Sequence, residues 1–190
     1  MKVVKSIALS AIVGLSFLNA ANYNVDTSHS DVGFKVKHMM ISNVKGGFDK
    51  FEGTFSIDEK TKRFSTINGT VDVASLTTKE TKRDVYLKSG DFFDVEKYPQ
   101  MHLQLIRQDR DIGTFEVTIK GITKIVILDI EEISGTIKDP WGNTRLAFEL
   151  HGKINRKDFN MNFNQVLESG GLIVGDIVKF DILVEGIQTK

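Results

Sequence analysis

Cysteine is absent from this chain of 190 residues, and proline occurs only twice. The absence of cysteine excludes disulfide scaffolds, thiolate zinc sites, iron–sulfur clusters and cysteine nucleophiles. An excess of charge of either sign is also lacking, because 25 Lys and Arg balance 25 Asp and Glu. This balance argues against a basic nucleic-acid-binding protein and against an acidic tail. The chain does contain 13 Phe, so it uses aromatic bulk heavily.

Residues 1–20 have the pattern of a secretory signal peptide. A positive n-region with Lys2 and Lys5 precedes an apolar h-region, and Ala20 offers a cleavage point. The apolar stretch is shorter than the about 20 residues needed to cross a bilayer, so no transmembrane segment is predicted. A buried N-terminal helix is the alternative, and it fits the flanking residues less well. We therefore expect residues 21–190 to form one mature domain in the bacterial periplasm.

The mature domain shows the alternation of apolar and polar residues that is typical of antiparallel strands. Asn68-Gly69 alone favours a hairpin turn, but a turn there would leave only residues 64–67 for the preceding strand. We therefore predict a continuous strand through Asn68-Gly69. The mostly apolar run 125–130 predicts a strand covered on both faces. Residues 78–89 lack the alternation and predict one helix, which ends before Gly90.

About eight strands separated by turns predict an all-β fold, either a closed barrel or a sandwich. A closed barrel is favoured because it leaves no exposed strand edges. An eight-stranded antiparallel barrel with an inserted helix can also enclose one small ligand.

Motifs for catalysis are missing. No metal-binding spacing is present among the four histidines, which are His29, His38, His102 and His151. Ser28, His29 and Asp31 are too close in sequence for a catalytic triad, whose members converge from separate elements. The expected roles of His29 and His38 are to fix a tight loop and to cap an apolar strand face. We therefore predict neither a metal site nor an enzyme.

Aromatic residues recur at the inward positions of the predicted strands: Phe34, Phe55, Phe115, Phe148 and Phe180. Phe92 and Phe93 add bulk beside the predicted helix, and Trp141 lies in a strand-end turn. A packed core explains any single ring. Large rings on several barrel strands can together line an elongated cavity for an apolar ligand. Composition leaves both the filled and the hollow barrel open.

Two arginines have alternative roles. Arg83 and Asp84 can form a structural pair on the helix, which is the explanation we favour. Alternatively, Arg83 or Arg145 can meet the acidic head group of a ligand at the mouth of a cavity.

Several blocks in order resemble the YceI family of bacterial periplasmic proteins. Residues 23–38 resemble the family's N-terminal signature of Asp, His-Ser, Phe and His. The further blocks are Gly46-Gly47-Phe48, Arg83-Asp84 with Asp91-Phe92-Phe93, Gly121-Ile122-Thr123-Lys124 and Asn155-Arg156-Lys157-Asp158-Phe159. One departure is Asn160, which stands where the family commonly has glycine, and we expect it to reshape a loop near the ligand.

The resemblance implies a lipocalin-like, eight-stranded antiparallel barrel with the helix packed over it. It also implies a hydrophobic tunnel for a polyisoprenoid such as a quinone or a polyprenyl phosphate, or for a similar long amphiphile. It brings no catalytic activity and no cofactor, and it implies a homodimer. We therefore expect a periplasmic binding or carrier protein. The alternatives are an enzyme that modifies the bound lipid through His29 or His38, and an interaction protein with a filled barrel.

The ligand's polar head is expected near the helix and the barrel rim, with His29, His38, Arg83 and Trp141 as candidates. The complete candidate site consists of Phe34, His29, His38, Phe55, Arg83, Phe92, Phe93, Phe115, Trp141, Arg145, Phe148 and Phe180.

Overall fold

The computed structural model describes residues 20–165 and 172–189. Apart from Ala20, the predicted signal peptide lies outside the described residues. The strands are β1 (Ala20–Val25), β2 (Asp31–His38), β3 (Ser42–Phe48), β4 (Phe51–Asp58), β5 (Arg63–Asp72), β6 (Leu76–Thr77), β7 (Gln100–Asp109), β8 (Ile112–Ile119), β9 (Ile122–Glu131), β10 (Ile137–Lys138), β11 (Thr144–Asn155) and β12 (Val174–Gln188). The helical elements are the short 3-10 turns η1 (Val73–Ser75) and η2 (Arg156–Phe159) and the helix α1 (Thr81–Lys88).

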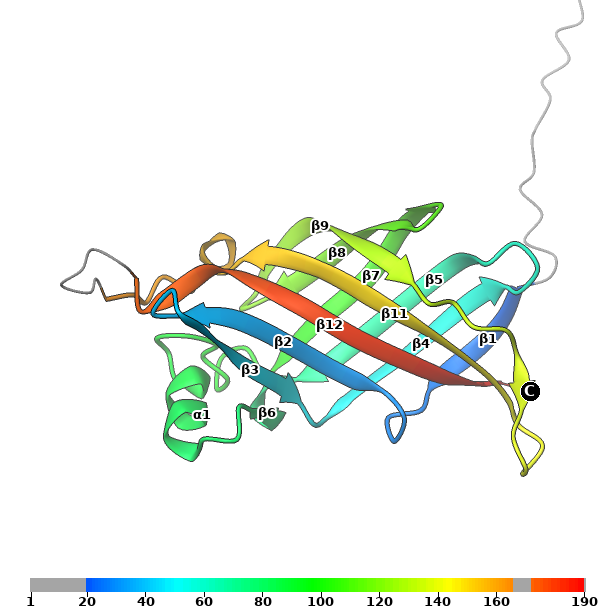
Figure 1. Cartoon of the computed structure of the whole chain (residues 1–190), viewed down its shortest axis with the longest axis horizontal. Coiled ribbons are helices and arrows are strands. Elements are labelled where there is room, and N and C mark those ends of the chain that lie inside the picture. Colours follow the sequence, from blue (N-terminus) through cyan, green and yellow to red (C-terminus); the bar gives the residue numbers. More distant parts are fainter. Residues whose placement is uncertain (1–19, 166–171, 190) are drawn as a thin grey trace, which may run out of the picture.

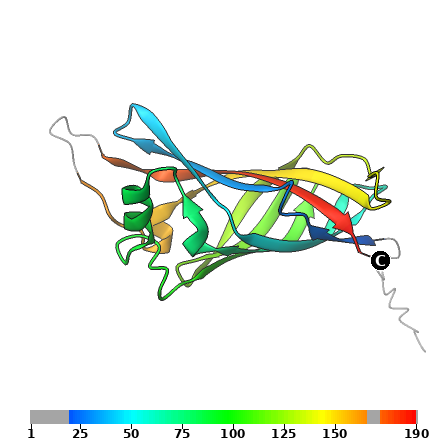
Figure 2. The ribbon, with the colours of Figure 1, turned by 90° about the horizontal axis from the view of Figure 1, so that it is seen from below.

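Eight of the described strands close into an antiparallel barrel, which confirms the predicted fold class. The order around the ring is β1, β4, β5, β7, β8, β9, β11 and β12, and β12 pairs again with β1. The long strand β12 pairs with β1 near its C-terminal end and with β2 over the rest of its length. From β2 the sheet continues to β3 and β6 (Figure 2).

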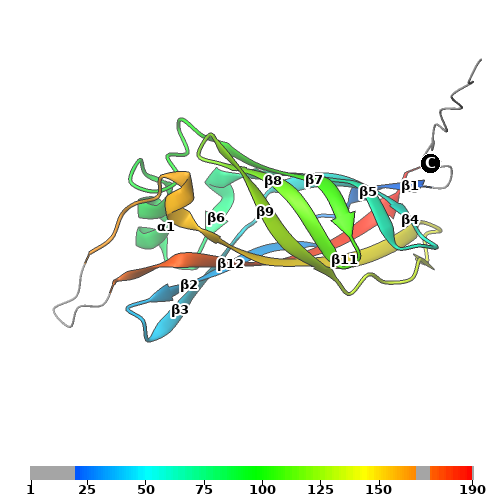
Figure 3. The same cartoon turned by 90° about the horizontal axis from the view of Figure 1, so that it is seen from above.

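The two ends of the barrel differ. At one end lie α1 and the β2–β3 hairpin, and at the other lie β10 and the C-terminus (Figures 1 and 3). The helix begins at Thr81, later than predicted, because the Glu80 carboxylate caps it by accepting hydrogen bonds from the Lys82 and Arg83 amides at 3.1 and 2.6 Å. It ends at Lys88, shortly before Gly90, as the sequence indicates.

The strand alternation places one apolar row of each strand inside the barrel. Strand β5 runs without interruption through Asn68-Gly69 and pairs with β4 and β7, so the prediction of a continuous strand is confirmed. The prediction that β9 is covered on both faces is wrong. Ile125 and Ile127 on its outer face are 60% and 54% exposed, because a single barrel wall has only its inner face packed.

The loop after η2 accommodates Asn160, which stands where the family commonly has glycine. Asn160 ends η2 in the left-handed region at φ 55°, and asparagine adopts this conformation more readily than most residues.

Among the helices that the structure describes, none is both long and apolar enough to span a bilayer.

Candidate ligand-binding cavity

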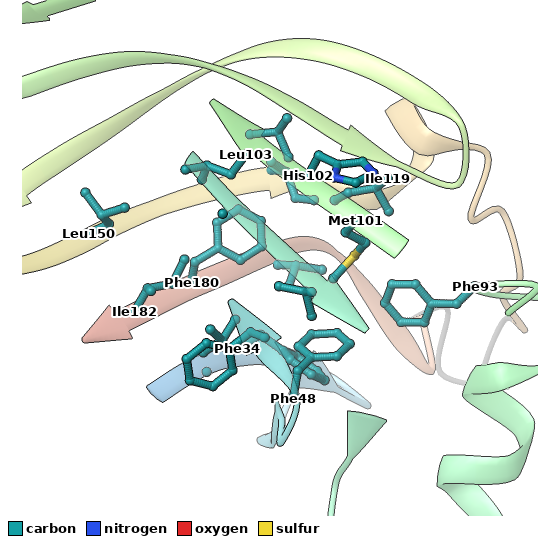
Figure 4. Close-up of a pocket in the computed structure, with 18 of the residues that line it drawn as sticks. Phe34, Phe48, Phe93, Met101, His102, Leu103, Ile119, Leu150, Phe180 and Ile182 are labelled. Carbon is teal, nitrogen blue, oxygen red and sulfur yellow. The ribbon is translucent and has the colours of Figure 1, made fainter. Parts of the chain in front are cut away.

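An apolar cavity of about 410 Å³ lies inside the barrel. Its volume is within the range of small-molecule pockets. Inward side chains of four strands form its walls: Phe34 of β2, Met101 and Leu103 of β7, Ile119 of β8, and Phe180 and Ile182 of β12 (Figure 4). Alternation puts these side chains on the inner surface, and the barrel leaves space between them instead of filling it.

Four aromatic rings form a plug that closes the barrel interior away from α1. Tyr23 and Phe55 stack with their centroids 4.8 Å apart, and Phe148 meets Phe55 edge-on at 5.0 Å and Phe64 at 4.6 Å. All four residues are buried. Gly186 makes room for the plug, since a Cβ atom there would lie 2.4 Å from Phe55 Cε1. Phe55 and Phe148 also line the cavity, so the plug is its floor.

A second group of aromatic residues lies at the α1 end of the cavity. Tyr86, Phe92 and Phe163 form a triangle with centroid separations of 5.3 to 5.4 Å. Beside it, Phe48 contacts Phe34 at 5.8 Å and Phe93 at 6.0 Å. The cavity therefore extends from these rings, beneath α1, to the plug.

Arg83, a residue of α1, brings a positive charge to the cavity wall. Its Nε and Nη2 donate hydrogen bonds to Thr78 Oγ1 and to the Thr78 carbonyl oxygen at 2.7 and 3.0 Å. The Asp84 carboxylate accepts from the Thr78 amide at 2.8 Å, so both charged side chains bind Thr78 and do not pair directly. Among the described residues, Arg83 forms no ion pair. It is therefore a cation with hydrogen-bonding capacity for an anionic group.

Arg145 has a different environment at the far end of the barrel. Its guanidinium donates to Asp26, Asp139 and Glu185 at 2.7, 2.8 and 2.5 Å. Hydrogen bonds from Arg145 hold the pKa of Asp26 well below its usual range. Burial alone would raise the pKa of Asp139, but the hydrogen bonds from Arg145 and Asn143 outweigh it and lower that pKa to about 2. The cluster joins the β1–β2 loop, β12 and the turn before β11.

The same cluster contains three potential metal-ligating groups, Asp26, His29 and Glu185, whose ligand atoms lie within 4.8 Å of one another. The Arg145 guanidinium already contacts both carboxylates. Its positive charge disfavours a metal ion at this place.

The structure brings together most, but not all, of the candidate residues. Those that line the cavity are Phe34, His38, Phe55, Arg83, Phe92, Phe93, Phe148 and Phe180. Those that do not line it are His29, Phe115, Trp141 and Arg145. Phe115 is fully buried in the packed core, and Trp141 is 80% exposed in the turn between β10 and β11. His29 contacts Asp26 in the Arg145 cluster, with 3.0 Å between Nδ1 and Oδ2. The four proposed head-group contacts are thus divided between the two ends of the barrel.

Several lining residues were not among the candidates. Tyr86 and Leu87 lie three and four positions after Arg83, and this helical spacing indicates a shared face. Phe48 continues the inward alternation of β3 beyond Val44. Phe163 follows η2 in an irregular segment, where no periodicity identifies it.

This architecture, a closed antiparallel barrel with an internal apolar cavity, is that of a small-ligand-binding barrel. The profile of the YceI-like domain matches residues 23–186, and the chain belongs to the YceI family. It is 38% identical over 168 residues to the UPF0312 protein plu2095 of Photorhabdus laumondii, covering 83% of this chain and 87% of that protein.

Two solved structures extend the comparison. The YceI protein of Campylobacter jejuni is 34% identical with a TM-score of 0.67, over 87% of this chain and 96% of that one. A polyisoprenoid binding domain from Saccharophagus degradans has a TM-score of 0.63 at 13% identity, over 88% and 98% of the two chains, and so shares the fold.

Proposed function

We propose that this protein binds a long-chain isoprenoid, or a similar amphiphilic lipid, in its internal cavity and carries it through an aqueous compartment. The observation that carries the proposal is the apolar cavity of about 410 Å³ between the plug and α1. The fold shared with a polyisoprenoid binding domain supports the ligand class. An interaction protein with a packed core would fill this space with side chains, because protein interiors are close-packed and contain few voids larger than a water molecule.

Burial of the apolar chain supplies the driving force. Each methylene group that leaves water contributes about 0.8 kcal/mol, before the cost of ordering the ligand is subtracted. The rings and branched side chains of the wall offer dispersion contacts and no competing hydrogen bonds. The cavity therefore favours hydrocarbon and selects weakly among chains of similar width.

The head group belongs at the α1 end. Arg83 lines the cavity there without a carboxylate partner among the described residues, and His38 lines it from the end of β2. An anionic head such as a phosphate suits the guanidinium, which can donate more than one hydrogen bond to it. His29, Trp141 and Arg145 lie away from this end and have no part in the proposed head-group site.

Solvent extraction of the purified protein followed by mass spectrometry tests the ligand directly. We expect a long-chain lipid to co-purify and added quinone or polyprenyl phosphate to bind. Repeated absence of both results would refute the proposal.

The variant Arg83→Gln tests the head-group site. We expect it to weaken binding of a polyprenyl phosphate and to leave binding of the neutral polyprenol unchanged. Arg63→Gln is a matched control, since Arg63 lies at the start of β5 and contacts the Gln108 carbonyl oxygen instead of the cavity. Equal losses for the phosphate and the alcohol would contradict the assignment of Arg83.

The proposal includes export, dimerisation and the absence of catalysis. Export to the periplasm predicts that the mature protein begins after residue 20, which the mass of the secreted protein checks. The homodimer predicts twice the monomer mass in light scattering.

An enzyme that modifies the lipid is the competing function. It would be favoured if the wild type converts the bound lipid and if His38→Ala still binds the lipid but no longer converts it.

A further inference from the structure

The β2–β3 hairpin has an unusual tip. The Ile41 amide donates to the His38 carbonyl oxygen at 3.1 Å, and the two central residues, Met39 and Met40, have φ of 49° and 63°. Positive φ at both central residues is what a type I′ turn requires, and Asn-Gly is the preferred sequence for it. The backbone of a methionine is strained in this conformation. The stability of the turn therefore does not explain why methionine occupies positions 39 and 40.

The same tip exposes apolar surface to water. Met39, Met40 and Ile41 are 38%, 58% and 83% exposed. The β2–β3 hairpin that carries them lies at the same end of the barrel as α1, which contributes Arg83 to the cavity wall (Figure 1). Three adjacent exposed apolar side chains at a strained tip are a feature of surfaces that bind an apolar partner.

Charge on the neighbouring sheet face is separated along the barrel. Four lysines on adjacent strands form one row, in which Lys45 pairs with Lys35, Lys35 with Lys179, and Lys179 with Lys153. Lys37 lies on the same face of β2, closer to the tip. We call these five residues the lysine band.

The rows farther from the tip on this face are acidic. The next row contains Asp181 and Asp129 with His151 between them, and the row after it contains Asp31, Glu149 and Glu131. Like charges directly opposite one another destabilise a sheet. Asp181 offsets part of this repulsion through its ion pair with Lys35 at 3.0 Å. The band thus makes the hairpin end of this face positive and the far end negative.

We propose that the hairpin tip and the lysine band dock this end of the barrel on a lipid bilayer that contains anionic phospholipids. Exposed apolar side chains enter the interface between head groups and acyl chains, and nearby lysines are attracted to the anionic surface. The acidic rows are repelled, so the molecule meets the membrane with α1 and the head-group end of the cavity first. That this contact loads or unloads cargo rests on the proposed function, but the contact itself does not.

Flotation with vesicles of equimolar phosphatidylcholine and phosphatidylglycerol tests docking. We expect the wild-type mature protein to float with these vesicles, to float less as NaCl is raised, and to stay in solution with vesicles of phosphatidylcholine alone. Failure to bind the anionic vesicles at low salt would overturn the proposal.

The double variant Met39→Asn/Met40→Gly isolates the tip. It introduces the sequence that a type I′ turn prefers, so its unfolding midpoint in urea should equal or exceed that of the wild type. Its vesicle affinity should fall at least about tenfold, because the apolar side chains are gone. A stable variant with wild-type vesicle binding would exclude the tip.

The double variant Lys45→Gln/Lys153→Gln isolates the band. A lysine close to an anionic surface changes affinity by about fivefold, so the loss should approach about 25-fold. Lys60→Gln/Lys138→Gln is the matched control, because it removes the same charge from the β4–β5 turn and from β10, which lie at the opposite end of the barrel (Figure 1). Equal losses in the two double variants would exclude the band as an orienting feature.

Binding of farnesol, followed by thermal shift without vesicles, separates this proposal from the proposed function. Vesicle binding without farnesol binding would support docking and count against the carrier. Farnesol binding without vesicle binding would leave the carrier and overturn the docking surface. If the protein does not bind anionic vesicles but binds a protein partner through the hairpin tip, the tip would be assigned to that partner. This outcome would also overturn the proposal.

Discussion

Truncation of one ring of the plug should lengthen the cavity. Phe148 is fully buried, lies 5.0 and 4.6 Å from the rings of Phe55 and Phe64, and forms part of the cavity floor. Phe148→Ala should destabilise the unliganded protein by about 3–5 kcal/mol, as buried Phe truncations do. Small domains have about 5–15 kcal/mol in total, so the variant should still fold.

The space vacated by Phe148 is continuous with the cavity, so a longer chain can occupy it. One isoprene unit has about five carbons, which amounts to about 4 kcal/mol of transfer free energy before ordering costs. This gain is comparable to the loss from truncation. Longer prenols should therefore restore most of the variant's stability, while in the wild type they should gain little over shorter ones.

Thermal shift with farnesol, geranylgeraniol and solanesol measures the effect, since a ligand stabilises in proportion to the logarithm of its concentration over its Kd. Phe115→Ala is the matched control, because Phe115 is equally buried and inward-facing but does not line the cavity. It should lose similar stability without a change in the preferred chain length. An unchanged length preference in Phe148→Ala would show that the plug does not limit the cavity.

Three further outcomes test other features. Gly186→Ala places a Cβ atom 2.4 Å from Phe55 Cε1, so urea unfolding should show a loss of about 1–3 kcal/mol from overpacking. The pKa of Asp139 is lowered to about 2 beside Arg145. Its stabilising contribution is therefore present above about pH 4 and is lost as pH falls from about 4 to 2. Urea midpoints at a series of pH values should record this loss. A flat profile in that window would contradict the ion cluster. Glu80→Ala removes the cap of α1 and should cost about 0.5–2 kcal/mol, with faster amide exchange in the helix but not in the barrel strands.

The sequence predicts the barrel well because strand alternation is a local property. The inward row of each strand, the helix α1 and the continuous strand through Asn68-Gly69 all follow from residues close to one another in the chain. Coverage of an outer face is not local. The apolar run of β9 indicates burial on both sides, yet Ile125 and Ile127 face outward and are more than half exposed.

The site is predicted less completely because alternation gives direction but not depth. Phe115 and Phe148 are both inward-facing, and only the register of the closed ring decides that one is core and the other cavity floor. The roles of the two arginines depend on contacts between distant segments. Arg145 binds Asp26, 119 residues away, whereas Arg83 binds Thr78, its neighbour before the helix.

Under the proposed function, the aromatic plug also determines the order of events in ligand exchange. A barrel closed at one end is a dead-end compartment, so an incoming chain cannot push the resident one out from behind. Under the proposed function, release must come first, and the rate at which a resident lipid leaves should not depend on the concentration of its replacement. The tail enters first and leaves last, so an acceptor meets the head group before any hydrocarbon.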